Sequence, residues 1–179
     1  MAFNLKPFNM IERLKSLSQK AVDAYGLKEE QVHVGHLLLQ GLCGDPEYVH
    51  QIDGATDERH TNLEVATITA RLADAMSNSG LQPGDHVVLI GPNNIWSSLP
   101  FYACHYNGYA LCGIDHRIAP RELEHLFSNV RPKLVFCSTQ STDEVQKALN
   151  VNNLSSQVVT FQGEYNLDAF IEEFKGNEK

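Results

Sequence analysis

Short apolar runs alternate with helix-like segments from residue 86 onward, and this alternation restricts the fold more than any other feature of the chain. The segment HVVLIG at 86–91 contains a continuous apolar run, which is typical of a strand buried on both faces. Further strands are predicted at 109–114, 133–137 and 157–161, and helices at 94–106, 120–129, 141–149 and 167–175. Because strands separated by helices pair in parallel through right-handed crossovers, the sequence predicts an α/β fold: a layered, mostly parallel sheet with flanking helices.

The chain before residue 61 predicts two helices and a strand. Apolar residues recur at helical spacing over 9–25, and Gly26 can end that helix. A shorter helix is predicted at 33–42 and a strand at 48–52, and the segment DGATD at 53–57 has the composition of a turn. The apolar stripe of the first helix is Met10, Ile11, Leu14, Leu17, Ala21 and Tyr25.

A third helix has a clear start. Thr61 and Glu64 form a capping box, in which the hydroxyl accepts from an amide one turn later and the carboxylate reaches back. The helix is predicted to run to about Ser77, with an apolar stripe formed by Val65, Ile68, Leu72 and Met76.

The turn after the strand at 86–91 invites comparison with a phosphate-binding loop. Gly91 is its only glycine, so neither glycine-rich phosphate motif is present. Asn93 or Asn94 is instead predicted to cap the helix that follows. Pro100 is expected to kink that helix, because proline removes an interior amide donor.

Charge and cysteine usage exclude several classes of function. The net charge is −8 and no basic run occurs, which argues against a nucleic-acid or anionic-membrane surface. The cysteines are scattered and form no close pair, which predicts buried free thiols in a reducing compartment rather than a disulfide framework or a zinc site. They are Cys43, Cys104, Cys112 and Cys137.

The sequence restricts the cellular compartment of the protein less than it restricts the fold. No apolar run approaches the ~20 residues of a membrane span, and residues 1–10 lack the apolar centre of a secretory signal. Cytoplasmic localisation is therefore favoured. A mitochondrial presequence is the alternative, because residues 1–20 carry one acid against Lys6, Arg13, Lys15 and Lys20.

Four aromatic side chains are the candidates for a ligand pocket. They fall in one expected helix, where core packing accounts for them as well as a pocket does. They are Trp96, Phe101, Tyr102 and Tyr106.

Two other patterns contain residue types that can carry chemistry. Asp115 and His116 resemble a dyad and Ser97 or Ser98 could be its nucleophile, yet no strained G-x-S-x-G elbow surrounds either serine. Glu122 and His125 could share a helix face, but nothing in the spacing requires a metal. We therefore assign no catalytic residue, no cofactor-binding residue and no metal ligand.

An ordered series of motifs resembles the opening of the adenylate-forming superfamily, which contains acyl-CoA synthetases, 4-coumarate ligases and insect luciferases. The series is TNLEV at 61–65, GLQPGDHV at 80–87, NGYALCGID at 107–115 and RELEH at 121–125. The resemblance covers roughly 33–175. It implies an N-terminal amphipathic extension at 1–30, an incomplete N-terminal subdomain of that family at 31–175, and a tail at 176–179.

The resemblance also carries expectations about chemistry. Such enzymes adenylate a carboxylate with ATP and Mg and then form a thioester with CoA, using a Ser/Thr/Gly-rich loop that ends in Pro-Lys-Gly. No such loop occurs in this sequence, so no catalytic residue is carried over and no cofactor is expected for this chain. In the family, an aspartate at the position of Asp115 caps or orients the next loop, and proline commonly stands where this chain has Gly113.

Three functions remain open. The first is a truncated relative without adenylation activity that binds an apolar ligand or a protein, either as a homodimer or with another partner, through a face left uncovered. The second is a fragment or short isoform of an ATP-dependent fatty-acyl-CoA or 4-coumarate-like ligase. The third is a repurposed α/β module that binds a small apolar or pigment-like ligand, or a protein.

Overall fold

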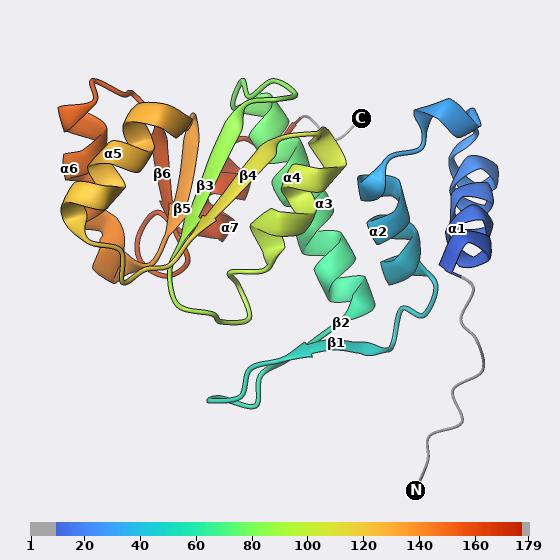
Figure 1. Cartoon of the computed structure of the whole chain (residues 1–179). Helices are drawn as coiled ribbons and strands as arrows, with labels where there is room; N and C mark the ends of the chain where they lie inside the picture. The colour runs from blue at the N-terminus through green and yellow to red at the C-terminus, as the bar shows by residue number, and fades with distance from the viewer. Residues whose placement is uncertain (1–9, 177–179) are drawn as a thin grey trace, which may run out of the picture.

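A computed structural model describes residues 10–176, and Figure 1 shows its elements. The side chains of the expected N-terminal stripe, residues 1–9 and most of the tail at 176–179 lie outside the described part. The helices are α1 (Met10–Tyr25), α2 (Val34–Cys43), α3 (Asn62–Asn78), α4 (Leu99–Asn107), α5 (Pro120–Val130), α6 (Thr142–Val151) and α7 (Leu167–Glu173), with short 3-10 turns at Glu29–Gln31 and Thr139–Ser141. The strands are β1 (Val49–Ile52), β2 (Arg59–Thr61), β3 (His86–Ile90), β4 (Ala110–Ile114), β5 (Leu134–Cys137) and β6 (Gln157–Thr160).

The main sheet has four parallel strands in the order β4-β3-β5-β6. Its faces are covered by different helices, α3, α4 and α7 on one and α5 and α6 on the other (Figure 1). The predicted layered α/β fold with a parallel sheet is therefore confirmed.

Each face of the sheet has its own apolar core. Alternate residues of the strands point to opposite faces, so one strand supplies both cores. The core under α3, α4 and α7 includes Leu72, Met76, Val87, Leu99, Leu134, Phe136, Val159 and Phe170. The core under α5 and α6 includes Val88, Ile90, Leu123, Phe127, Val135, Val145 and Leu149.

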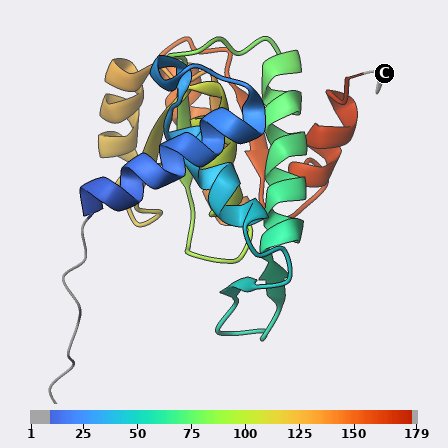
Figure 2. The ribbon, with the colours of Figure 1, turned by 90° about the vertical axis from the view of Figure 1, so that its right-hand side faces the viewer.

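Two further helices lie outside these layers. α2 packs on α3 and α4, and α1 packs on α2 as the outermost element (Figure 2). Gly26 ends α1 as predicted, with a φ of +63°. Among the described residues, no helix has the length and apolar character that a bilayer crossing would require.

The predicted capping box at the start of α3 is confirmed. The Thr61 hydroxyl accepts from the Glu64 amide at 3.3 Å, and the Glu64 carboxylate accepts from the Thr61 amide at 2.7 Å. These backbone and side-chain hydrogen bonds hold the pKa of Glu64 below its usual value.

Loss of this cap is expected to destabilise the chain. Thr61→Ala should lower the free energy of unfolding by about 1 kcal/mol, because an amide of the first turn loses its partner. Urea unfolding followed by circular dichroism measures the change. Thr67→Ala, on an exposed position of the same helix, is the control and should lie within about 0.5 kcal/mol of the parent. Equal losses in both variants would show that the cap contributes nothing.

A two-stranded antiparallel hairpin, β1 and β2, projects beside α3 and α4. The sequence predicted β1 and the turn at 53–57 but missed β2. The hairpin is fixed to the body by polar contacts: His50 bonds Tyr102 at 2.7 Å, and Gln51 donates to the Ile95 carbonyl at 2.8 Å. Because β2 has three residues, Arg59, His60 and Thr61, and none is aliphatic, no apolar period marks it.

The helix predicted at 94–106 starts later, and that prediction is corrected. α4 begins at Leu99, because the Asn94 side chain accepts from the amides of Trp96 and Ser97 and holds 94–97 in a turn. Asn94 thus caps the turn rather than α4. Pro100 lies in the first turn of α4, where no interior amide is lost, so the expected kink does not arise.

All four cysteines are free thiols, as predicted, but only Cys104 and Cys137 are buried. Burial raises the pKa of the Cys104 thiol to about 12 and that of Cys137 to about 11. Cys112 is half-buried on β4, and Cys43 is exposed at the end of α2, which corrects the expectation of buried thiols there.

Candidate functional site

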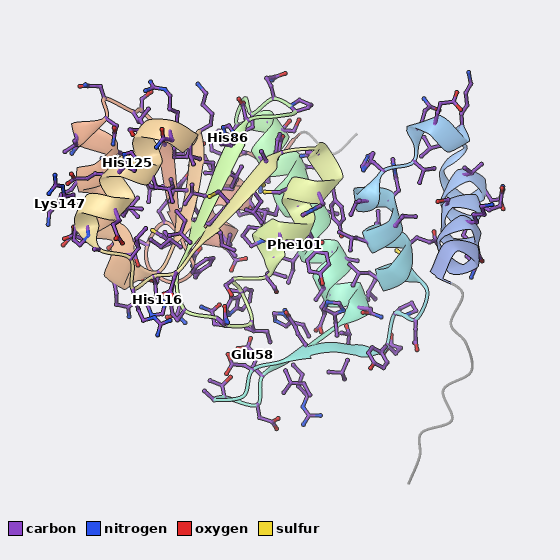
Figure 3. All side chains as sticks on the ribbon, viewed as in Figure 1. Glu58, His86, Phe101, His116, His125 and Lys147 are labelled. Atoms are coloured by element: carbon purple, nitrogen blue, oxygen red, sulfur yellow. The ribbon has the colours of Figure 1, made fainter. Side chains whose placement is uncertain are left out.

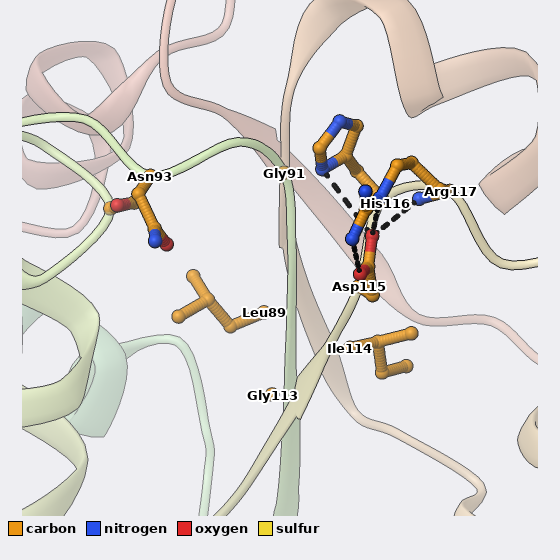
Figure 4. A pocket seen from close by; sticks show the side chains of 9 residues that line it. Leu89, Gly91, Asn93, Gly113, Ile114, Asp115, His116 and Arg117 are labelled. Carbon is orange, nitrogen blue, oxygen red and sulfur yellow. Dashed lines mark hydrogen bonds and ion pairs between the residues drawn. The ribbon is translucent and has the colours of Figure 1, made fainter.

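A crevice of about 360 Å³ opens at the carboxyl ends of β3 and β4 (Figure 4). The chain leaves β3 toward α4 on one face of the sheet and leaves β4 toward α5 on the other. Open α/β sheets bind ligands outside the carboxyl ends of their strands, and the order β4-β3-β5-β6 reverses between β3 and β5, so the crevice adjoins that topological switch point on the β4 side of β3. The crevice is lined by Leu89, Gly91, Asn93, Ser97, Gly113, Ile114, Asp115, His116 and Arg117.

One wall is a charged turn after β4. Arg117 donates to both carboxylate oxygens of Asp115, from Nε at 3.0 Å and from Nη2 at 2.6 Å, and its amide donates to the same carboxylate at 2.9 Å. His116 Nδ1 lies 3.7 Å from that carboxylate (Figure 4). The Arg117 hydrogen bonds hold the pKa of Asp115 far below its usual range, so the carboxylate stays ionised. Asp115 therefore orients the following loop, as the resemblance implied.

The opposite wall is the turn after β3. The Ser97 hydroxyl donates to the Asn94 carbonyl at 2.9 Å, and Gly91 presses against neighbouring strands. A Cβ at Gly91 would lie 2.9 Å from the Phe161 ring and 3.3 Å from the Ser138 amide. Gly91 thus serves close packing here, in place of a phosphate cradle.

The floor of the crevice is open. A Cβ at Gly113 would meet no atom within 4 Å. The apolar side chain of Leu89, its partner on β3, lies on the same face of the sheet, and Ile114 lines the crevice from the other face. The crevice therefore offers a short apolar floor and a polar mouth, an arrangement suited to holding a small molecule by one end.

The imagined hydrolase arrangement does not form a hydrogen-bonded set. Ser97 donates to Asn94, and Ser98 donates to Gln51 at 2.7 Å, so both hydroxyls are engaged away from His116. Over residues 10–176, no group of three or more His, Cys, Asp and Glu side chains is arranged to hold a metal ion.

The four predicted pocket aromatics are dispersed. Trp96 lines a separate cavity of about 260 Å³ with Phe161 and Leu167, and its ring meets His60 edge-on at 5.1 Å. The other three lie along α4. The Phe101 and Tyr102 rings meet at 5.5 Å, with Phe101 exposed to solvent (Figure 3).

Tyr102 and Tyr106 both use their hydroxyls to join elements. Tyr102 contacts His50 of β1, and burial raises the pKa of its phenol. The Tyr106 hydroxyl lies 3.2 Å from that of Thr69 on α3. A shared ligand pocket for the four aromatics remains a prediction.

The sequence patterns brought Asp115, His116 and Ser97 together only as an imagined hydrolase set and did not join them to Gly91 and Asn93 in one site. Their common signal is position, because each follows the carboxyl end of a strand. Grouping them requires the knowledge that those two strands are neighbours, which the strand order supplies.

Comparison with known proteins places this fold among adenylate-forming proteins. The chain is 31% identical over 154 residues to luciferin 4-monooxygenase of Luciola mingrelica, covering 78% of this chain and 28% of that protein. It is 27% identical over 109 residues to a long-chain-fatty-acid–CoA ligase of Mycobacterium tuberculosis, covering 61% of this chain and 22% of that ligase. The chain thus spans less than a third of each relative's length.

The fold is also similar to that of a solved luciferase-like enzyme. The luciferase-like enzyme of the nonluminescent mealworm Zophobas morio superimposes with a TM-score of 0.75 at 24% identity, over 79% of this chain and 35% of that one. The model of the AMP-binding enzyme family matches residues 42–178. That match spans most of the sequence and confirms the resemblance in its motifs, so the chain belongs to the AMP-binding enzyme family.

Proposed function

We propose that this chain acts by binding, without adenylation activity of its own, and that the crevice between β3 and β4 takes a small carboxylic acid with an apolar body. The observation that carries the proposal is the open floor at Gly113, next to Leu89 and below the charged mouth at Arg117. Apolar clefts with a few convergent polar groups are the usual form of small-molecule sites.

The chemistry of the mouth favours an acid. Arg117 uses Nε and Nη2 on Asp115, and a guanidinium carries five N–H donors in all, so it can also donate to a ligand carboxylate. His116 adds a second nitrogen-bearing side chain at the same mouth. The names of the two relatives, a fatty-acid ligase and a luciferin monooxygenase, are consistent with an organic substrate that has an apolar body.

Decanoate is the probe for this site. Trp96 is the only tryptophan of the chain and precedes Ser97 of the crevice wall, so its fluorescence should report saturable binding. Gly113→Val should weaken binding at least about tenfold, or ~1.4 kcal/mol, because its side chain fills the floor. It should fold normally, since nothing lies within 4 Å of the new Cβ.

Gly54→Val is the matched control for the decanoate titration. Gly54 is another glycine with open space around its Cβ, in the turn between β1 and β2, and it does not line the crevice. Its binding curve should match that of the parent chain. Unchanged binding in Gly113→Val, or no saturable binding by the parent, would overturn the assignment of this crevice.

Adenylation is tested separately by ATP–pyrophosphate exchange with decanoate and Mg. We expect exchange at the level of the buffer blank, because positioned cations and amides supply most of the rate in such chemistry and the sequence has no Pro-Lys-Gly loop. A full-length acid–CoA ligase is the positive control. Exchange by the purified chain above the blank would refute the absence of adenylation without bearing on the crevice.

A second candidate function is ligation, performed by a longer protein of which this chain is the N-terminal portion. It is favoured by the short span of the relatives that the chain covers, 28% of the luciferin monooxygenase and 22% of the ligase. Sequencing of the transcript beyond the codon for Lys179 decides it. An in-frame Ser/Thr/Gly-rich loop followed by Pro-Lys-Gly would establish a ligase, and an immediate stop codon would exclude it.

A further inference from the structure

β4 forms one end of the main sheet, and within residues 10–176 no strand lies along its outer side. In the four-stranded order it pairs with β3 alone, and Figure 1 shows no further strand beyond it. Ala110, Leu111, Cys112 and Ile114 are half-buried and Gly113 is exposed, whereas β5 is buried throughout.

The phase of the hydrogen bonds identifies the free backbone groups. The Ala110 amide donates to the Asp85 carbonyl at 2.9 Å, and Cys112 pairs with Val88 in the parallel register. The backbone amides and carbonyls of successive residues point toward opposite edges of a strand. Those of Ala110, Cys112 and Ile114 therefore point toward β3. Those of Leu111 and Gly113 point outward.

This edge lacks three of the usual devices that prevent pairing: charged side chains, proline and a bulge. Edge strands are normally blunted by charged side chains, proline or a bulge, and ALCGI has neither charge nor proline and keeps a regular register with β3. We propose that β4 pairs with β4 of a second copy of this chain, antiparallel, about a two-fold axis at Cys112. The two sheets then join into one continuous sheet.

The proposed register is self-complementary. A two-fold axis at Cys112 places Leu111 opposite the second copy's Gly113. Both residues have outward backbone groups, so they exchange two hydrogen bonds. The two-fold symmetry forms the same two bonds between Gly113 and the second copy's Leu111. Further along, Asp115 lies opposite the second copy's Tyr109. No two like charges face each other across the strands, as a stable antiparallel pair requires.

The axis gives Cys112 a distinctive position. Cys112 of one copy lies directly opposite Cys112 of the second copy. The two residues form a non-hydrogen-bonded pair, in which Cα atoms lie about 4.5 Å apart. Disulfides span Cα separations of roughly 4.4–6.8 Å, so the two thiols can be joined without moving the backbone. With diamide as the oxidant, the two thiols lose two protons and two electrons to form the disulfide, and the azo group of diamide becomes a hydrazine.

Sedimentation velocity on the 179-residue chain is the first test. The parent should be a dimer at micromolar concentration. Gly113→Pro should raise the dimer dissociation constant at least about a hundredfold, because it deletes an outward amide, and proline is tolerated at such edge positions. A parent chain that stays monomeric at high micromolar concentration overturns the proposal.

Val158→Pro is the control on the opposite edge. The Gln157 amide donates to the Lys133 carbonyl, so the Val158 amide points away from β5 and proline deletes an outward donor there too. This variant should remain dimeric. Dissociation in Val158→Pro but not in Gly113→Pro would place the interface on β6 and refute the β4 pairing.

Cross-linking decides the register even if Gly113→Pro fails to fold. The exposed Cys43 is first removed by Cys43→Ser, and diamide should then give a disulfide-linked dimer. The double variant with Cys112→Ser should stay dimeric in sedimentation but give no cross-linked band. A dimer that never cross-links through Cys112 contradicts the proposed axis.

Discussion

Replacing Phe136 with alanine is expected to lower the free energy of unfolding by about 3–5 kcal/mol, the usual loss for a buried phenylalanine. Its ring is fully buried on β5 and meets Phe170 of α7 edge-on at 6.2 Å. The main sheet has four strands, and a loss of this size removes much of the 5–15 kcal/mol that typical domains possess. The variant should therefore unfold close to ambient temperature.

Urea titration measured by circular dichroism tests this expectation against a matched phenylalanine. Phe101→Ala removes a ring that is 40% exposed on α4, and it should cost less than about 1 kcal/mol. The difference between the two variants isolates burial, since the substitution is the same. Similar losses for both would mean that the β5–α7 contact is not part of the stable core.

Gly35→Ala is expected to separate α2 from α4. A Cβ at Gly35 would lie 2.3 Å from the His105 carbonyl oxygen and 2.8 Å from the Tyr106 Cα. Both atoms belong to backbone and cannot rotate away, so the helices must move apart. Overpacking of this kind costs about 1–3 kcal/mol. Because α1 packs on α2, its attachment to the body should weaken as well.

The same helix provides a control substitution whose expected change in stability has the opposite sign. Gly41 has no atom within 4 Å of its would-be Cβ, so Gly41→Ala should stabilise α2 by about 0.5–1 kcal/mol through its higher helix propensity. Thermal unfolding gives the sign for each variant, and hydrogen exchange of α2 amides shows where it acts. Stabilisation by both substitutions would show that α2 and α4 are not in close contact.

The strands of the main sheet were predictable because each is an apolar run bounded by a helix. β3 and β5 are nearly all apolar, and such runs arise where both faces are buried. The start of α3 was predictable from Thr61 and Glu64 because capping is local. The family followed from the same motifs and is confirmed by the match over 42–178.

The two failures have different causes, one a local side-chain hydrogen bond and the other contacts between distant segments. The late start of α4 results from the Asn94 side chain competing for the amides of Trp96 and Ser97. β2 pairs with β1, whose residues His50 and Gln51 are held by residues far along the chain. These interactions carry no periodicity that a sequence reading could use.

The candidate site was harder to foresee than the fold. Composition drew attention to Trp96 and Phe101, whereas the crevice is formed by a space beside Gly113. Such a space follows from strand order and from what packs nearby. Single-sequence patterns describe which side chains are present and say little about where atoms are missing.

The strand order also has a kinetic consequence. No two neighbours in β4-β3-β5-β6 are joined by a short turn, so each pairing must close a long loop before its contacts form. Such topologies fold slowly, whereas a hairpin such as β1–β2 closes in roughly 1–10 μs. During synthesis β3 emerges well before β5, so the apolar residues of β3 stay exposed to solvent until β5 has been synthesised. The nascent chain is therefore most prone to aggregation over this interval, and a chaperone that binds short apolar strands would act there.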